Sequence, residues 1–266
     1  MTERYDAAIR EQVLKDDQQI VGKAFDLLGN NARVIQANTR HMALMLMNPA
    51  VPDRASRMAA FAEELIDANL IQHIKEPVAC ARGCSHCRTT YVSTTLPEVF
   101  RLAQAASGKE EKHARVIVAA ARSKSMPQLE REVSRVICPI LDNHASTEYL
   151  HRPVVCRAVL SSSLPTCEQI FLNGAAEPFA APVSLAGLRS YIVIMMRAAL
   201  QLAGLAFRNY EMTHALEVAL AREDSEQRWL AGEPIFADVA IDRLDLGDSP
   251  LNKIVDGLAG AARPTI

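Results

Sequence analysis

Residues 80–87 read Cys-Ala-Arg-Gly-Cys-Ser-His-Cys, a loop-forming stretch that separates two regions with a helical pattern. Its three cysteines have the spacing Cys-x3-Cys-x2-Cys, and the other cysteines of the chain follow at Cys138, Cys156 and Cys167. Cysteines gathered in this way are typical of proteins that hold a zinc ion or an iron–sulfur cluster through thiolates. The sequence therefore predicts an all-α fold: an irregular helical bundle with a loop-rich cysteine metal-binding module inserted between helices.

The composition favours helices and argues against nucleic-acid binding. Hydrophobic residues make up 49% of the chain and aromatic residues only 5%, and Gly occurs 11 times. Such a composition favours helices over sheets. A net charge of −2 and a pI near 6.4 are unlike those of a general nucleic-acid binder, which is normally basic.

The polar, mixed-charge residues 1–6 lack the pattern of a secretory signal, so a cytoplasmic location with reduced thiols is expected. Structural disulfides or plain buried thiols are the alternative, because six cysteines can also pair.

Apolar spacing and stop signals predict helices on both sides of the cysteine stretch. They are expected near residues 2–28, 32–47, 52–75, 95–107, 109–124, 127–136, 167–172, 183–209, 213–222 and 225–230. Thr95 and Glu98 have the spacing of a capping box, and the alternative for Glu98 is a place at the metal site.

These patterns divide the chain into four regions. We expect an N-terminal helical region at 1–76, the cysteine module at 77–175, a C-terminal helical region on the same core at 176–247, and a disordered tail at 248–266.

The apolar stretch 185–207 is long enough to be tested as a membrane span. If this stretch forms a helix, its polar residues fall within a single arc of about 120° around the helix axis. These are Arg189, Ser190, Arg197, Gln201 and Arg208. An arginine near the centre of a span costs about 2.5–3.5 kcal/mol. We therefore expect no membrane span here but a core helix with one edge facing solvent or a partner.

All six cysteines are candidate metal ligands: Cys80, Cys84, Cys87, Cys138, Cys156 and Cys167. Four thiolates complete a tetrahedral site. We favour the three clustered cysteines plus one from the segment between Cys138 and Cys167, because a metal would then tie two loops together.

Histidines and arginines near the cysteines could contribute to such a site. Three histidines are candidate nitrogen ligands, although each is more often an ordinary surface or core residue: His86, His144 and His151. Three arginines lie beside cysteines and are expected to favour the thiolate forms: Arg82, Arg88 and Arg157.

The order of these motifs resembles the YkgJ-type cysteine-cluster family, whose members are described as zinc- or iron-chelating domains. The matching elements span about residues 78–170. They are the cluster at 80–87, Glu98 on a capped helix, Cys138-Pro-Ile-Leu141, Tyr149-Leu-His-Arg-Pro-Val-Val-Cys-Arg157 and Cys167. The resemblance implies a thiolate-held zinc ion or iron–sulfur cluster.

Two positions depart from the family pattern. Arg88 stands where the family often has a second consecutive cysteine, and Ser146 stands where a cysteine precedes the tyrosine. Both changes remove thiolates, so a second metal in relatives would be missing in this chain.

Several functions are compatible with these motifs. The first is a cytosolic protein holding zinc or an iron–sulfur cluster such as [4Fe–4S], acting in metal handling, electron transfer or structural support. The second is a non-catalytic, zinc-stapled scaffold for a protein partner. Two enzyme alternatives rank below them. The spacing Cys80-x3-Cys84-x2-Cys87 also occurs in radical S-adenosylmethionine enzymes, and some relatives combine such a module with methylation of protein lysines.

Overall fold

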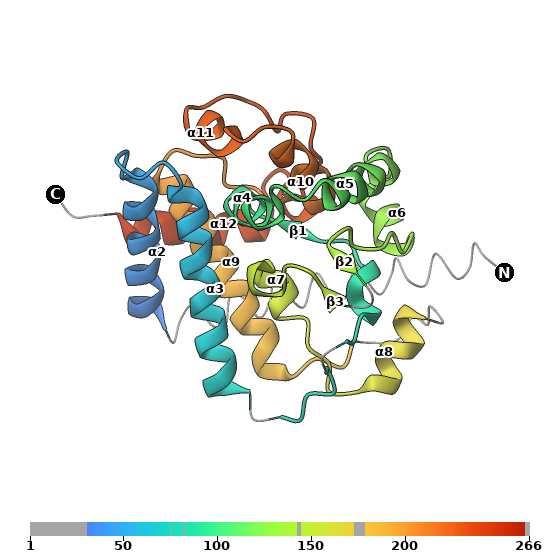
Figure 1. Ribbon diagram of the computed structural model, residues 1–266. Coiled ribbons are helices and arrows are strands. Elements are labelled where there is room, and N and C mark those ends of the chain that lie inside the picture. Colours follow the sequence, from blue (N-terminus) through green and yellow to red (C-terminus); the bar gives the residue numbers. More distant parts are fainter. Residues whose placement is uncertain (1–30, 75, 82, 143–144, 173–178, 264–266) are drawn as a thin grey trace.

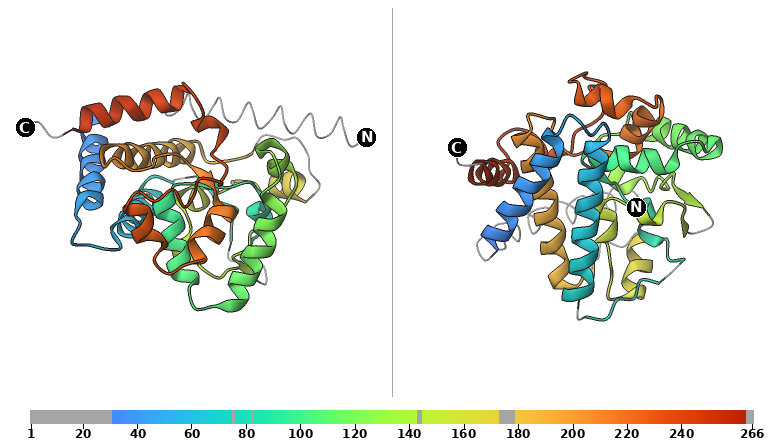
Figure 2. Two further views of the ribbon diagram at one scale, coloured as in Figure 1. Left: turned by 90° about the horizontal axis from the view of Figure 1, so that it is seen from above. Right: turned by 60° about the vertical axis from the view of Figure 1, so that its left-hand side comes forward.

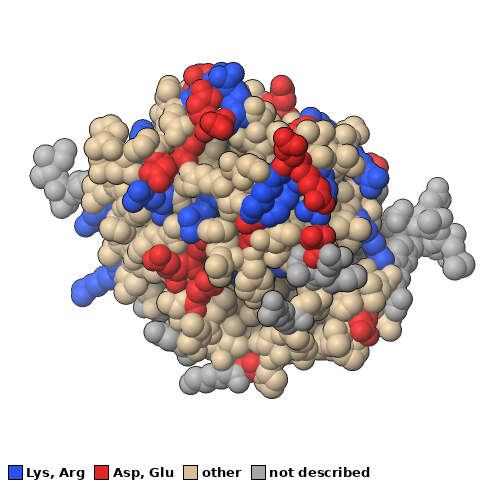
Figure 3. Space-filling view, viewed as in Figure 1, with Lys and Arg blue, Asp and Glu red and all other residues tan. Residues whose placement is uncertain are grey.

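The computed structural model describes residues 31–74, 76–81, 83–142, 145–172 and 179–263, and within them the chain is mostly helical (Figure 1). This confirms the all-α class. The helix predicted at 2–28 lies outside the described residues. The Lys and Arg side chains on the face shown in Figure 3 are interspersed with Asp and Glu, without one large basic patch.

The helices follow the predicted segments closely up to residue 230. They are α2 (Ala32–Met47), α3 (Arg54–His73), α4 (Leu96–Ala106), α5 (Glu110–Ser123), α6 (Gln128–Val133), α7 (Val154–Arg157), α8 (Leu164–Phe171), α9 (Val183–Leu202), α10 (Met212–Leu220), α11 (Ser225–Leu230) and α12 (Pro250–Ala262). Short 3-10 helices are η1 (His86–Thr89), η2 (Tyr149–His151) and η3 (Arg243–Asp245).

The described residues include two small antiparallel sheets, one of which joins distant loops. Strand β1 (Ser93–Thr94) pairs with β4 (Tyr210–Glu211), and β2 (Leu141–Asp142) pairs with β3 (Ala145–Ser146). The first pairing is long-range, and it places the end of the cysteine loop beside the start of α10.

Helix α9 is the centre of the molecule. It packs against α2, α3, α7 and α12, so helices from both ends of the chain surround it (Figure 2). Its residues from Ile194 to Leu200 are all buried, which is expected of a helix enclosed on every side. No helix in the described part of the chain is both long and apolar enough to cross a membrane. The helix ends at Leu202 instead of near 209, because Gly204 takes a left-handed conformation with φ +71°.

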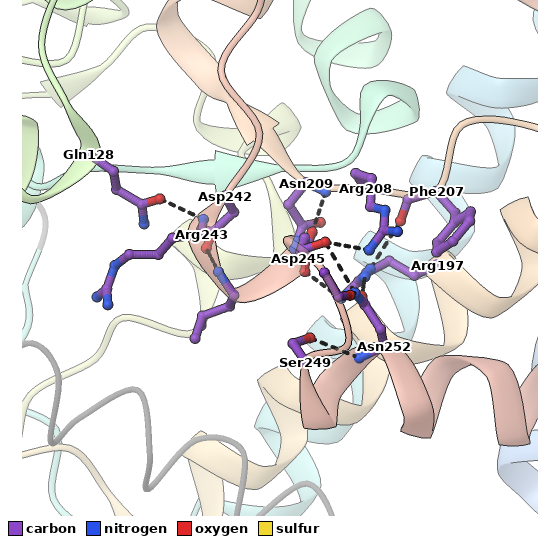
Figure 4. Close-up of polar contacts among 12 residues, drawn as sticks. Gln128, Arg197, Phe207, Arg208, Asn209, Asp242, Arg243, Asp245, Ser249 and Asn252 are labelled. Atoms are coloured by element: carbon purple, nitrogen blue, oxygen red, sulfur yellow. Dashed lines mark hydrogen bonds and ion pairs between the residues drawn. The ribbon is translucent and has the colours of Figure 1, made fainter.

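Arg197 corrects the expectation of a polar edge on this helix. Its side chain is 0% exposed, and Nη1 lies 2.7 Å from Oδ1 of Asp245 (Figure 4). Its Nη2 donates to Oδ1 of Asn252 at 2.7 Å, and its Nε donates to the carbonyl of Phe207 at 2.9 Å. The charge in the middle of the helix is therefore neutralised inside the protein by the segment that follows α10 and α11.

Helix α12 is a second correction, because the tail 248–266 was expected to be disordered. Ser249 begins the helix by accepting a hydrogen bond from the amide of Asn252, and Pro250 occupies its first turn. Its buried apolar face packs on α9 and α2. This face consists of Leu251, Ile254, Val255 and Leu258. The far end is held by Arg40, whose Nε donates to the carbonyl of Ala262.

The N-terminus of α3 is capped from a distant element. Asp53 precedes the helix but its side chain makes no capping hydrogen bond. Instead, Oε1 of Glu226 on α11 accepts hydrogen bonds from the amides of Ala55 and Ser56, both at 2.9 Å. Glu226 is buried, so this contact joins the early helices to the late ones within the core.

Candidate metal centre

Backbone hydrogen bonds hold the separate cysteine segments against one another. The amide of Ala79 donates to the carbonyl of Ser161 at 2.7 Å, and the amide of Cys138 donates to the carbonyl of Arg88 at 2.8 Å. The amide of Ser161 also donates to Sγ of Cys80 at 3.3 Å. The clustered cysteines are thus anchored both to the segment before α8 and to the segment after α6.

One group of thiols forms where η1 packs against α8. Burial raises the pKa of Cys87 to about 11, the Arg88 guanidinium opposes this rise, and negative charge on Cys80, Cys84 and Cys167 adds to it. Burial likewise raises the pKa of Cys167, and negative charge on Cys80 and Cys84 adds to that rise. Because the interaction of two charges weakens with distance, these effects and the contact between η1 and α8 place these four thiols in one group.

The other two cysteines form a second group. Burial raises the pKa of Cys156 to about 12, and negative charge on Cys138 contributes further to the rise. Burial also raises the pKa of Cys138, while Arg88 acts to lower it. Together with Cys87, they line a cavity of about 320 Å³. Cys87 is therefore the residue that both groups share.

The structure stops short of a preformed metal site. All six cysteines are free thiols. Within the described residues, no group of three Cys, His, Asp or Glu side chains has the arrangement of metal ligands. The predicted ligation of a metal by the six cysteines therefore stays a prediction.

Of the arginines expected to favour the thiolate forms, Arg88 acts on cysteines and Arg157 does not. Arg88 acts to lower the pKa of Cys87, Cys138 and Cys156, as its position predicted. The expectation for Arg157 is wrong, because its guanidinium turns to α3. There Nη2 lies 3.1 Å from Oε2 of Glu63 and Nη1 lies 2.5 Å from Oδ2 of Asp67.

Two of the three candidate histidines lie within the described residues. Arg82 and His144 lie outside the described residues. His86 is half-buried on η1, and burial lowers the pKa of His151 on η2.

The capping box predicted for Thr95 and Glu98 is confirmed. Oε2 of Glu98 accepts from the amide of Thr95 at 3.0 Å and from the hydroxyl of the same residue at 2.8 Å. Its Oε1 accepts from the amide of Val154 at 2.8 Å, at the start of α7. The carboxylate is 1% exposed, and it therefore connects the beginning of α4 to the motif that carries Cys156.

We expect Glu98→Ala to lower the free energy of unfolding by about 2–3 kcal/mol. The substitution leaves the buried amides of Thr95 and Val154 without an acceptor, and each such loss costs about 1–3 kcal/mol. Urea denaturation followed by circular dichroism measures the change. The matched control is Glu111→Ala on the exposed side of α5, which should change stability by less than about 0.5 kcal/mol. Equal effects of the two substitutions would contradict the linking role of Glu98.

Comparison with known proteins adds no relative: the chain matches no protein-family model, no curated protein and no solved structure. The resemblance to the cysteine-cluster family thus rests on the motifs alone and stays a prediction.

The cavity beside Cys87, Cys138 and Cys156 was missed by the sequence analysis. Among its lining residues, Arg131 on α6 is 2% exposed and Tyr91 is half-buried. Neither stands in a motif, and an arginine on a short helix is normally exposed. No local pattern could have indicated that this one lies inside the protein.

Proposed function

We propose that this chain is a metal-binding protein in which Cys80, Cys84, Cys87 and Cys167 hold a zinc ion or an iron–sulfur cluster as thiolates. The observation that carries the proposal is the packing of η1, which holds Cys87, against α8, which holds Cys167. Negative charge on Cys80 and Cys84 raises the pKa of both of these thiols. Four thiolates are the ligand set of structural zinc sites and of common iron–sulfur clusters. The proposal selects one quartet from the six candidate cysteines.

Two further contacts support this quartet. The amide of Ser161 donates to Sγ of Cys80, and hydrogen bonds to ligating sulfurs help to orient and tune metal centres. Arg88 lies within electrostatic range of Cys87 and would offset part of the negative charge of four thiolates. Both contacts come from residues that the fold already holds in place.

A metal at this position would join segments that are far apart in the sequence. A zinc ion would fasten the cluster at 80–87 to α8 and would have a structural role, because zinc has no redox chemistry. An iron–sulfur cluster would add electron transfer at the same position. The segments that carry these thiols already contact one another, so binding of either group would not have to bring them together from a distance.

Metal analysis of the protein purified without oxygen tests the proposal. We expect either one zinc per chain without colour, or about four irons with sulfide and a broad brown absorbance. Titration of accessible thiols before and after metal removal should show four additional reactive cysteines after removal. Protein that contains neither metal after growth with both, and whose six thiols all react from the start, would refute the proposal.

A further inference from the structure

A cavity of about 320 Å³ lies between the cysteine segments and the helical core. Its walls come from the stretch 87–93, from α6, α7 and α9, and from the start of α10. Small-molecule pockets commonly measure about 300–1,000 Å³, so this cavity suits a compact organic ligand. On the side of α9 and α10 the wall includes the apolar side chains of Val193, Ile194 and Met212. Apolar walls offer water no hydrogen bonds, so they favour a ligand with an apolar body.

The wall of this cavity also carries a buried carboxylate, that of Asp242, which is only 6% exposed. Its Oδ1 accepts a hydrogen bond from the amide of Leu244 at 2.9 Å. Within the described part of the chain, no basic side chain forms an ion pair with it. An ionised carboxylate can accept several hydrogen bonds, and burying it without an opposite charge is costly. A positively charged group beside Asp242 would therefore be stabilising.

Tyr91, another residue of the wall, lies among carboxylates. Burial raises the pKa of its phenol, and four carboxylates add to this rise. In order of decreasing effect they are Asp242, Glu211, Glu132 and Asp245. Because the effect of a charge weakens with distance, the carboxylate of Asp242 is the foremost charge acting on this part of the wall.

Arginines balance three of these four carboxylates. The pairs are Arg131 with Glu211, which is the foremost charge acting on it, Arg243 with Glu132 at 3.7 Å, and Arg197 with Asp245 at 2.7 Å. The remaining arginines nearby have other neighbours. Arg208 contacts the carbonyl of Asp245 and the ring of Phe207. Arg189 has a partner of its own, and Arg88 is half-buried and acts on the cysteines. Among the described residues, Asp242 is therefore the one carboxylate of the four without a positive partner.

A second acceptor lies directly beside this carboxylate. Tyr210 and Ile241 form an antiparallel bridge, and the amide of Asp242 donates to the carbonyl of Asn209 at 2.9 Å. Asp242 and Asn209 thus lie opposite each other on neighbouring segments, where Cβ atoms are about 4.5–5.5 Å apart (Figure 4). Asn209 is 8% exposed, lines the same cavity, and its buried Oδ1 accepts no hydrogen bond from the described residues.

The hydroxyl of Tyr91 is also buried without a partner among the described residues. Buried polar atoms in native proteins almost always have a hydrogen-bond partner, so this hydroxyl and Oδ1 of Asn209 require an explanation. An ammonium group carries three N–H donors and no acceptor, and its positive charge matches the carboxylate of Asp242. A neutral apolar ligand would leave all three oxygen-bearing groups unsatisfied, and an anion would add a second negative charge beside Asp242.

We propose that this cavity binds a small organic amine in its ammonium form, with the ammonium group against Asp242, Asn209 and Tyr91 and its apolar body among the side chains of α9 and α10. The inference does not depend on the metal centre, because none of these three residues belongs to the proposed quartet of ligands.

Fluorine NMR on the full-length purified protein at neutral pH tests the inference with two probes of similar shape and different charge. We expect the signal of 4-fluorobenzylamine, which is a cation at this pH, to broaden and shift in proportion to protein concentration. The uncharged 4-fluorobenzyl alcohol should bind at least about tenfold more weakly, because it cannot neutralise the buried carboxylate.

Variants locate the binding. Asp242→Asn removes the charge and keeps an oxygen for the amide of Leu244, and it should weaken binding of the amine by at least about tenfold. Tyr91→Phe, which removes only a hydroxyl, should weaken it by about threefold. Asp248→Asn is the matched control, because Asp248 is exposed, and it should leave binding unchanged. Circular dichroism confirms folding of each variant, and if Asp242→Asn fails to fold, Tyr91→Phe takes its place.

The inference is overturned by any of three results. The amine and the alcohol could bind equally, the amine could fail to bind at millimolar concentration, or the amine could bind the folded Asp242→Asn variant as tightly as the unchanged protein.

Discussion

Cys167→Ala is expected to weaken metal binding more than tenfold, whereas Cys156→Ala leaves the metal content of the purified protein unchanged. Cys167 lies on α8 within electrostatic range of Cys80, Cys84 and Cys87, while Cys156 neighbours Cys138. Even residues that only orient a ligand change metal affinity by about 10–100-fold, so loss of a ligand should exceed that. Elemental analysis and competition with a chelator measure both variants.

The two variants are a matched pair, since each removes one partly or fully buried thiol from the same module. Cys84→Ala should behave like Cys167→Ala, because both residues belong to the proposed quartet. If the Cys167 variant kept its metal and the Cys156 variant lost it, Cys156 and not Cys167 would be a ligand. That result would refute the assignment. Loss in all variants would show that the six cysteines act as one unit.

We expect Asp245→Asn to lower the free energy of unfolding by about 3–5 kcal/mol. The substitution leaves Arg197, which is 0% exposed, without its opposite charge. An arginine cannot escape this by losing its proton, and breaking one side of a buried ion pair typically costs this much. Urea denaturation at neutral pH, with an unchanged dependence on denaturant concentration, measures the loss.

The control for this pair is an exposed ion pair of similar geometry. Arg57 and Asp53 lie 2.9 Å apart, but the side chains are 64% and 37% exposed. Asp53→Asn should therefore change stability by less than about 1 kcal/mol. A double replacement of Arg197 and Asp245 by Met and Leu should recover much of the loss, because a buried pair exchanged for apolar residues is often neutral. If Asp245→Asn and Asp53→Asn had similar effects, the structural importance of the buried pair would be refuted.

Local signals in the sequence predicted the helices well, because each depends on neighbouring residues. Helix α2 has the predicted bounds, and Glu98 forms the expected cap. The polar residues on α9 were misinterpreted, since Asp245, which neutralises Arg197, comes from a segment far along the chain. A charge on an otherwise apolar helix indicates solvent or a partner, and here the partner is internal.

The choice of the fourth cysteine ligand also depends on residues that are far apart in the sequence. The spacing of Cys80, Cys84 and Cys87 brings them close together whatever the rest of the chain does. Whether Cys138, Cys156 or Cys167 joins them depends on how α8 packs against η1, which no local pattern contains. The cavity and its buried Arg131 depend on tertiary packing for the same reason.

The cap that Glu226 provides for α3 also constrains the order in which the chain can fold during synthesis. Its hydrogen bonds connect residues 171 and 170 positions apart, so the ribosome makes α3 long before it makes the acceptor for its first amides. Helix α12, which covers α9 and α2, is made later still. In the nascent chain, the first amides of α3 therefore lack this acceptor until α11 has been made, and the faces of α9 and α2 that α12 covers stay exposed until α12 has been made.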